Sequence, residues 1–167
     1  MAAKKITIIG ADFEDNAVNI QTTWYITQAT DYGSSATYTP TLANGGWAFG
    51  NSAQTSLRGK TFNTFKFKPY GSGTLNIYKA TALDGTSTLL TSITISANES
   101  GTWVTKITPS VTLGSAEFLV VGEANSQVGM YYAKNASGTG FYSKVPSGSY
   151  ATVTEQSLCF DIGLTTY

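Results

Sequence analysis

The stretch TFNTFKFKPYGSGTLNIYKA, residues 61–80, is the part of the chain that decides the fold class. Phe65 and Phe67 alternate with Lys66 and Lys68, and after a Gly-Ser-Gly turn apolar and polar side chains alternate again. Successive side chains of a strand project to opposite faces of a sheet. This period of two therefore predicts a pair of half-buried strands joined by a turn.

The same alternation recurs towards the carboxyl end of the chain. It places Trp103, Thr105 and Ile107 on one face of a strand, and it points Cys159 and Asp161 of the last strand away from the core. These patterns predict a core between two sheets. The side chains predicted to fill it are Phe65, Phe67, Leu75, Ile77, Ile93, Ile95, Trp103, Phe118, Val120, Leu158, Phe160 and Ile162.

Turn residues such as Asp84-Gly85 and Pro109-Ser110 separate the predicted strands. The continuous apolar run EFLVVGE, residues 117–123, predicts a strand that is covered on both faces. No segment carries apolar residues at the i, i+3, i+4, i+7 spacing of a substantial helix. Together these features predict an all-β chain built as an antiparallel β-sandwich.

The beginning of the chain differs from the rest. Residues 1–23 combine one short apolar strand with a polar connector, and we expect them to form an attachment arm on a globular body of residues 24–167. So short a segment buries too little apolar area to offset the cost of ordering its backbone. Ile6, Ile8 and Phe13 are therefore expected to dock into a partner subunit by strand addition. The alternative is that the segment adds an edge strand to the same body.

Composition favours a protein that works outside cells. The chain is rich in Thr, Ser, Gly and Tyr, only 12% of its residues are charged, and it has no His. Its first residues are nevertheless not expected to form a secretory signal, because the apolar stretch Ile6–Ile9 is short and Asp12 follows closely. A virion protein is made in a cytoplasm and released by lysis. That origin reconciles the two observations.

Charge and apolar content limit the partners. The formal net charge is zero and no basic block is present, so nucleic acid is not an expected partner. No apolar stretch approaches the roughly 20 residues that span a bilayer, so no membrane insertion is expected. A neutral chain tends to associate, which favours a homo-oligomer. The single Cys159 cannot form an intrachain disulfide.

Two stretches resemble known families. The pattern Ile6 to Phe13 followed by Asn16-Ala17-Val18 resembles the I-x-G-x-D-F-x-x-N-A-V element near the start of virion fibre and appendage proteins of phages and prophages from Bacteroides-type hosts. The stretch from Leu57 to Glu123 is similar to jelly-roll modules of carbohydrate-binding type. The resemblance implies a virion protein with a jelly-roll body, such as a head fibre, capsid decoration or tail fibre. It also favours a homotrimer bound to other virion proteins.

The chemistry available to the side chains argues against an enzyme. Without His, the Ser-His-Asp and Cys-His types of catalysis and His-containing zinc sites are excluded. Asp12, Glu14 and Asp15 lack the ligand spacing of a calcium loop, and no cofactor or metal is expected. A carboxylate pair for glycoside hydrolysis is conceivable. A glycosidase-like enzyme is accordingly the third interpretation, after a structural virion protein and a free carbohydrate-binding module.

Aromatic side chains give the one positive indication of binding. Trp47 follows a flexible Asn-Gly-Gly, and Tyr131-Tyr132 and Phe141-Tyr142 are adjacent pairs in strand-like surroundings. An exposed aromatic ring beside amide and hydroxyl groups suits the apolar face of a sugar, so a surface glycan is a candidate ligand. The alternative is that these rings fill the core or an oligomer interface. The candidate hydrogen-bonding companions are Asn51, Asn125 and Gln127.

Overall fold

A computed structural model describes residues 20–27, 36–39, 46–122, 128–134, 141–144, 148–153 and 156–166. Within these ranges strands dominate, and the helical elements are the short helix α1 (Asn51–Leu57) and one 3-10 turn, η2 (Ala97–Glu99). None of the helices described is long and apolar enough to cross a membrane. The predicted strand Ile6–Ile9 and the attachment residues Ile6, Ile8 and Phe13 lie outside the described residues.

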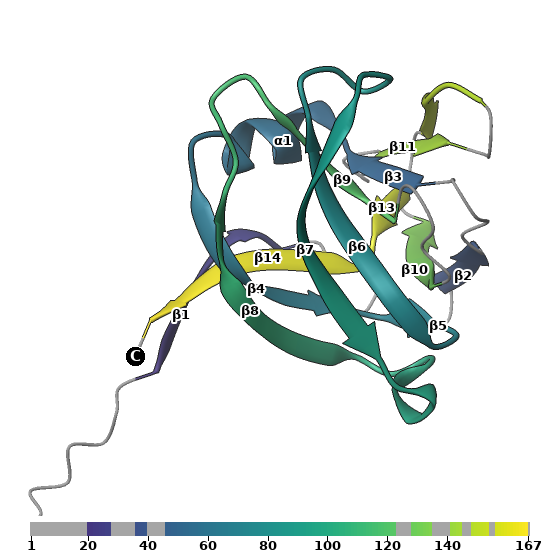
Figure 1. Cartoon of the computed structure of the whole chain (residues 1–167). Coiled ribbons are helices and arrows are strands. Elements are labelled where there is room, and N and C mark those ends of the chain that lie inside the picture. The colour runs from purple at the N-terminus through teal and green to yellow at the C-terminus, as the bar shows by residue number, and fades with distance from the viewer. Residues whose placement is uncertain are drawn as a thin grey trace, which may run out of the picture.

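Two large antiparallel sheets face each other across the core (Figure 1). The first sheet has the order β1 (Gln21–Ile26), β14 (Phe160–Thr166), β4 (Thr61–Phe67) and β8 (Val104–Thr112). The second has the order β12 (Ala151–Val153), β11 (Phe141–Lys144), β3 (Gly46–Phe49), β9 (Phe118–Val121), β6 (Gly73–Ala80) and β7 (Ser87–Ile95). A small third sheet joins β13 (Gln156–Leu158), β10 (Gly129–Lys134) and β2 (Ala36–Thr39), and β5 (Pro69–Tyr70) also pairs with β10. The predicted all-β antiparallel sandwich is confirmed.

Phenylalanine side chains occupy the middle of the inter-sheet core. The Phe160 ring stacks on Phe67 with 5.0 Å between centroids, and it meets Phe49 and Phe65 edge-on at 5.6 and 6.1 Å. All four rings are fully buried. Phe49 belongs to the second sheet and the other three to the first, so these contacts tie the two sheets together. Offset and edge-to-face arrangements are the ones that aromatic rings prefer.

The phase of β9 differs from the prediction. Leu119 and Val121 face the inter-sheet core. Val120 is therefore buried on the opposite, outer face of the second sheet. Phe118 is half-buried beside the Arg58 guanidinium, which lies 4.6 Å from the ring centroid. The predicted burial of Phe118 and Val120 between the sheets is wrong. A continuous apolar run contains no alternation from which its inward face can be determined.

The phase of β8 is also opposite to the prediction. Ile107 is 49% exposed, and Trp103 is half-buried with the Lys66 ammonium 5.8 Å from its ring. Val104, on the other face, packs against the core. The predicted core position of Trp103 is therefore wrong. Residues with long or branched side chains occur on both faces of this strand, so the sequence alone does not show which face is inward. The register of β8 with β4 determines the inward face.

The start of β14 is buried on both faces. Cys159 and Asp161, predicted to face solvent, are 2% and 6% exposed. β14 is paired with β1 on one side and β4 on the other. Neighbouring side chains also reach across its outer face, since a Cβ atom at Gly163 would lie only 3.0 Å from the Trp24 ring. The alternation thus separates the two faces of this strand but does not show that one is exposed.

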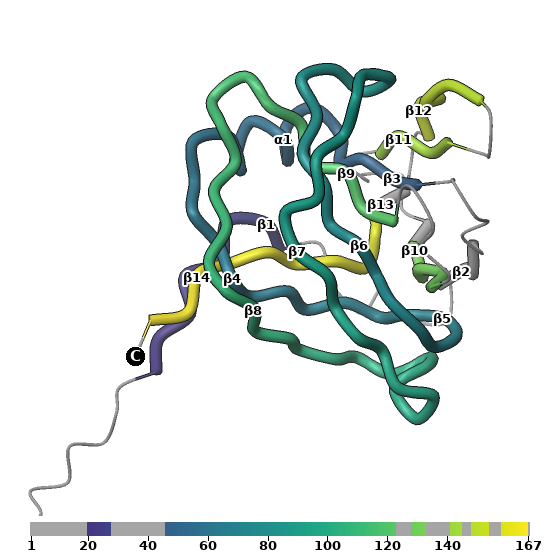
Figure 2. Tube along the Cα trace, in the orientation of Figure 1, coloured from purple at the N-terminus to yellow at the C-terminus, as the bar shows by residue number. Residues whose placement is uncertain are grey.

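The first sheet has two opposite ends. β1 and β14 run side by side to one of them (Figure 2). Gln21 pairs there with Thr166, so the predicted boundary between arm and body, at residue 24, falls inside β1. At the other end Phe160 of β14 pairs with Phe67 of β4, and β4 continues into β5. We call the first the entry end and the second the distal end.

Two buried amide side chains pair with backbone groups at positions where the backbone pairing of two strands stops. Gln54 of α1 donates to the Leu119 carbonyl and accepts from the Leu119 N–H, both at 2.9 Å. Asn63 of β4 donates to the Thr165 carbonyl at 3.0 Å and accepts from the Thr165 N–H at 2.8 Å. Each amide takes the place of a neighbouring peptide group. Backbone groups that would be costly to bury unpaired are thereby satisfied.

Candidate functional site

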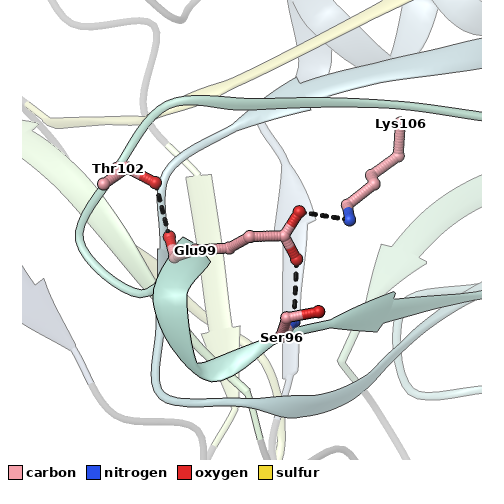
Figure 3. A network of polar contacts seen from close by, with 4 residues as sticks. All are labelled: Ser96, Glu99, Thr102 and Lys106. Carbon is pink, nitrogen blue, oxygen red and sulfur yellow. Dashed lines mark hydrogen bonds and ion pairs between the residues drawn. The ribbon is translucent and has the colours of Figure 1, made fainter.

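The turn between β7 and β8 lies at the distal end, because Val104 at the start of β8 pairs with Phe67. Figure 3 shows its polar contacts around Glu99. Glu99 organises this turn. Its Oε2 accepts a hydrogen bond from the Ser96 N–H at 2.7 Å, and its Oε1 accepts one from Lys106 Nζ at 2.5 Å. The Thr102 hydroxyl donates to the Glu99 carbonyl at 2.8 Å. Ser96 and Glu99 form a capping box around η2, which fixes the shape of the turn.

The Glu99 carboxylate of this turn is paired with the Lys106 ammonium. The hydrogen bonds from Lys106 and from the Ser96 N–H lower the pKa of Glu99 below its ordinary value of 4.5. Glu117 resembles it, because hydrogen bonds from Lys79 and from a backbone N–H lower its pKa. A general acid at neutral pH needs a raised pKa. Neither carboxylate has a raised pKa, and the hydrogen bonds that each accepts hold the backbone of its turn.

Hydrogen bonds fasten the same turn to β5. The Gly101 N–H donates to the Pro69 carbonyl at 2.7 Å, and the Gly71 N–H donates to Ser100 Oγ at 2.9 Å. Gly101 adopts a φ of +76°, a conformation that residues with side chains rarely adopt, and a Cβ atom there would lie 3.7 Å from the Tyr131 hydroxyl. The turn, β5 and Tyr131 of β10 therefore form one continuous surface.

A partly exposed aromatic pair lies on this surface. The Tyr70 and Tyr131 rings are tilted with 6.3 Å between centroids, and Lys68 Nζ lies 4.9 Å from the Tyr131 centroid. Tyr70 is 42% exposed. We call Lys68, Tyr70 and Tyr131 the distal platform. Aromatic faces with a nearby cation and hydroxyl groups offer apolar contact and hydrogen bonding together, which suits a sugar or a polar protein surface.

The five aromatic residues singled out in the sequence do not form one site. Trp47 and Phe141 are each 2% exposed and belong to the core. Tyr132 packs against that core, 5.9 Å from the Phe141 centroid. For these three rings the core alternative holds, and Trp47 and Phe141 are closed to a glycan. Tyr131 lies on the distal platform, and Tyr142 lies elsewhere.

Tyr142 lies on the outer face of the second sheet. Its hydroxyl donates to Asn51 Oδ1 at 3.1 Å, which brings one predicted amide companion next to one predicted ring. Tyr150 packs against the same small cluster, and its N–H donates to Asp84 Oδ1 at 3.0 Å. The other two predicted companions, Asn125 and Gln127, lie outside the described residues.

Sequence reasoning missed Lys68 and Tyr70. The dipeptide Pro69-Tyr70 before a glycine indicates a turn, and nothing local places it beside Tyr131. That proximity depends on pairing of β5 with β10, between segments about sixty residues apart in the chain. The available signal was weak: Tyr70 continues the outward set of Lys66 and Lys68 at a spacing of two.

In the described part of the chain, no three His, Cys, Asp or Glu residues come together as metal ligands would. A scan against models of protein families and searches of curated proteins and of solved structures found no match.

Proposed function

We propose that the protein is a non-enzymatic structural protein of a phage virion, such as a head fibre, capsid decoration or tail appendage. In this proposal the residues before β1 attach the protein to the particle and the sandwich projects from it. Support comes from composition, from the amino-terminal resemblance, and above all from the geometry of the first sheet.

The observation that carries the proposal is the position of the entry end relative to the distal platform. β1 starts and β14 finishes at the entry end, where Gln21 pairs with Thr166. The platform lies at the other end of the same sheet, beyond Phe67. A body held at the entry end presents Tyr70 and Tyr131 outward. This arrangement suits a projecting subunit that meets a surface.

We further infer that the sandwich is a jelly roll. When β2, β5 and β10 to β13 are set aside, eight strands remain, and they are numbered here from first to eighth in chain order: β1, β3, β4, β6, β7, β8, β9 and β14. One sheet holds the first, eighth, third and sixth of them, and the other holds the second, seventh, fourth and fifth. This interleaving is the order of a double Greek key. Jelly rolls occur in capsid and lectin domains alike, so the fold by itself does not decide function.

The test of the virion assignment is the composition of purified particles. Phage particles from the host that carries this gene are banded by density and digested with trypsin. We expect the tryptic peptide of residues 107–134 at a constant ratio to the major capsid protein across the band. Recovery of the protein only from the soluble fraction would contradict the assignment.

A free carbohydrate-binding module is the second candidate, favoured by the exposed Tyr70–Tyr131 pair and its lysine. The two candidates differ in the role of the amino-terminal segment. Deleting residues 1–20 leaves β1 intact. It should abolish particle incorporation while leaving any glycan binding unchanged. If the deletion instead unfolds the body, the segment is part of the sandwich and the attachment arm is wrong.

A further inference from the structure

β7 is an outer strand of the second sheet. In the described part of the chain its strand partner is β6, on one side. The other side of such a strand presents backbone N–H and C=O groups that can pair with another chain. The nine residues of β7, STLLTSITI, include no charged residue, Pro or Gly. β7 therefore lacks the residues that commonly prevent edge pairing.

The other outer strands of the two large sheets carry such protection. β8 contains Lys106 and Pro109, and Pro cannot donate to a ladder. β12 has only three residues. β1 has a register shift between Trp24 and Ile26, which twists a strand away from further pairing. β7 has one register shift, near Leu90, which leaves Thr91–Ile95 as a regular segment.

The segment Thr91–Ile95 is complementary to itself. When two copies run antiparallel with Ile93 opposite Ile93, Ser92 lies opposite Thr94, and Thr91 lies opposite Ile95. Ser92 and Thr94 are exposed on the outer face, whereas Ile93 and Ile95 are 3% and 2% exposed on the inner face. Hydroxyl side chains thus face hydroxyl side chains, which is a favourable cross-strand pair, and no charges oppose each other.

We propose that β7 pairs with β7 of a second copy of this chain, antiparallel and centred on Ile93. The pairing joins the two second sheets into one continuous sheet across a two-fold axis. Such an interface is isologous, so each copy contributes the same residues. Leu89, which is 51% exposed on the same strand, adds apolar area beside the paired segment. The pairing does not depend on whether the protein is a virion component.

The test measures the mass of the full chain in solution. Sedimentation of the wild-type protein at about 100 µM should give twice the chain mass of 17.7 kDa, and dilution should shift it towards the monomer. A wild-type protein that stays monomeric overturns the proposal. A trimer overturns it too, and would favour association about a three-fold axis.

Two matched double variants test the register. S92K/T94K places lysine opposite lysine twice across the two-fold axis, so we expect a monomer. S92K/T94E differs only in the charge at position 94 and places lysine opposite glutamate twice, so we expect the dimer to be retained. Melting temperatures verify that both variants fold. If both folded variants have the same mass, this pairing of β7 is wrong.

Discussion

The inter-sheet core and the distal platform both consist of aromatic residues held close together, yet they are stabilised differently. Phe160 and the three phenylalanines around it are fully buried and pack ring against ring. Tyr70 and Tyr131 are partly exposed, and the turn below them is held by hydrogen bonds and one ion pair. The free energy of folding becomes more favourable as more apolar area is buried, whereas exposed polar contacts contribute little net free energy. The core therefore carries stability, and the platform is free to carry recognition.

The largest expected effect is in the core. Phe160→Ala removes the ring that contacts phenylalanines of both sheets. It should cost about 3–5 kcal/mol, as for other buried aromatic residues. For a chain of this size the melting temperature should fall by roughly 6–20 °C. Thermal unfolding followed by circular dichroism measures the shift.

Phe118→Ala is the matched control for the core. Phe118 is half-buried beside Arg58 on the outer side of the second sheet. Its truncation removes less buried area, so the free energy of unfolding should fall by roughly half as much as in Phe160→Ala, or less. Equal losses for the two variants would contradict the division between an inter-sheet core and an outer face.

The next effect is at the buried amide of α1. Gln54→Ala leaves the N–H and carbonyl of Leu119 buried without their partner, which should cost about 2–4 kcal/mol. Gln54→Glu keeps the shape but sets a carboxylate against the Leu119 carbonyl. Burial raises the pKa of that introduced acid, so its penalty should shrink as pH falls and the acid becomes a donor. Urea unfolding at neutral and acidic pH measures both variants. A loss of stability in Gln54→Glu that is independent of pH would contradict the hydrogen bonds between this side chain and the Leu119 backbone.

The sequence predicts the inward face well where apolar and polar residues alternate, and poorly in the continuous apolar run of β9 and on the exposed surfaces. Clean alternation located Phe65, Phe67 and Ile77 in the core, because each strand has one apolar and one polar face. β9 lacks alternation, and its inward face was assigned wrongly. The distal platform is made by β5 pairing with β10 across a long stretch of chain. Such proximity depends on tertiary packing, which local sequence patterns do not reveal.

A smaller effect concerns the turn that supports the platform. The folded-state pKa of Glu99 lies below 4.5, so the folded protein binds fewer protons than the unfolded chain at acidic pH. Its contribution is therefore present above about pH 4.5 and is lost as pH falls through the folded-state pKa. Lys106→Met removes the ion pair and should cost at most about 1 kcal/mol near pH 7. The free energy of unfolding of this variant should then change less with pH than that of the wild type between about pH 5 and 3. An unchanged pH dependence would show that the Glu99–Lys106 pair does not stabilise the fold.

The smallest effect on stability, and the largest on recognition, is expected at Tyr70. Its ring is 42% exposed, so Tyr70→Ala should change the free energy of unfolding by about 0.5 kcal/mol or less. Loss of the ring opens the Tyr70–Tyr131 pair, and binding on a glycan array should fall at least about tenfold, as for loss of an aromatic contact. Tyr142→Ala is the matched control, because Tyr142 is a partly exposed tyrosine on a different sheet face. Binding lost in Tyr142→Ala and kept in Tyr70→Ala would move the site to the second sheet. If the wild-type protein binds no glycan on the array, glycan is excluded as the ligand of the distal platform and a protein surface remains.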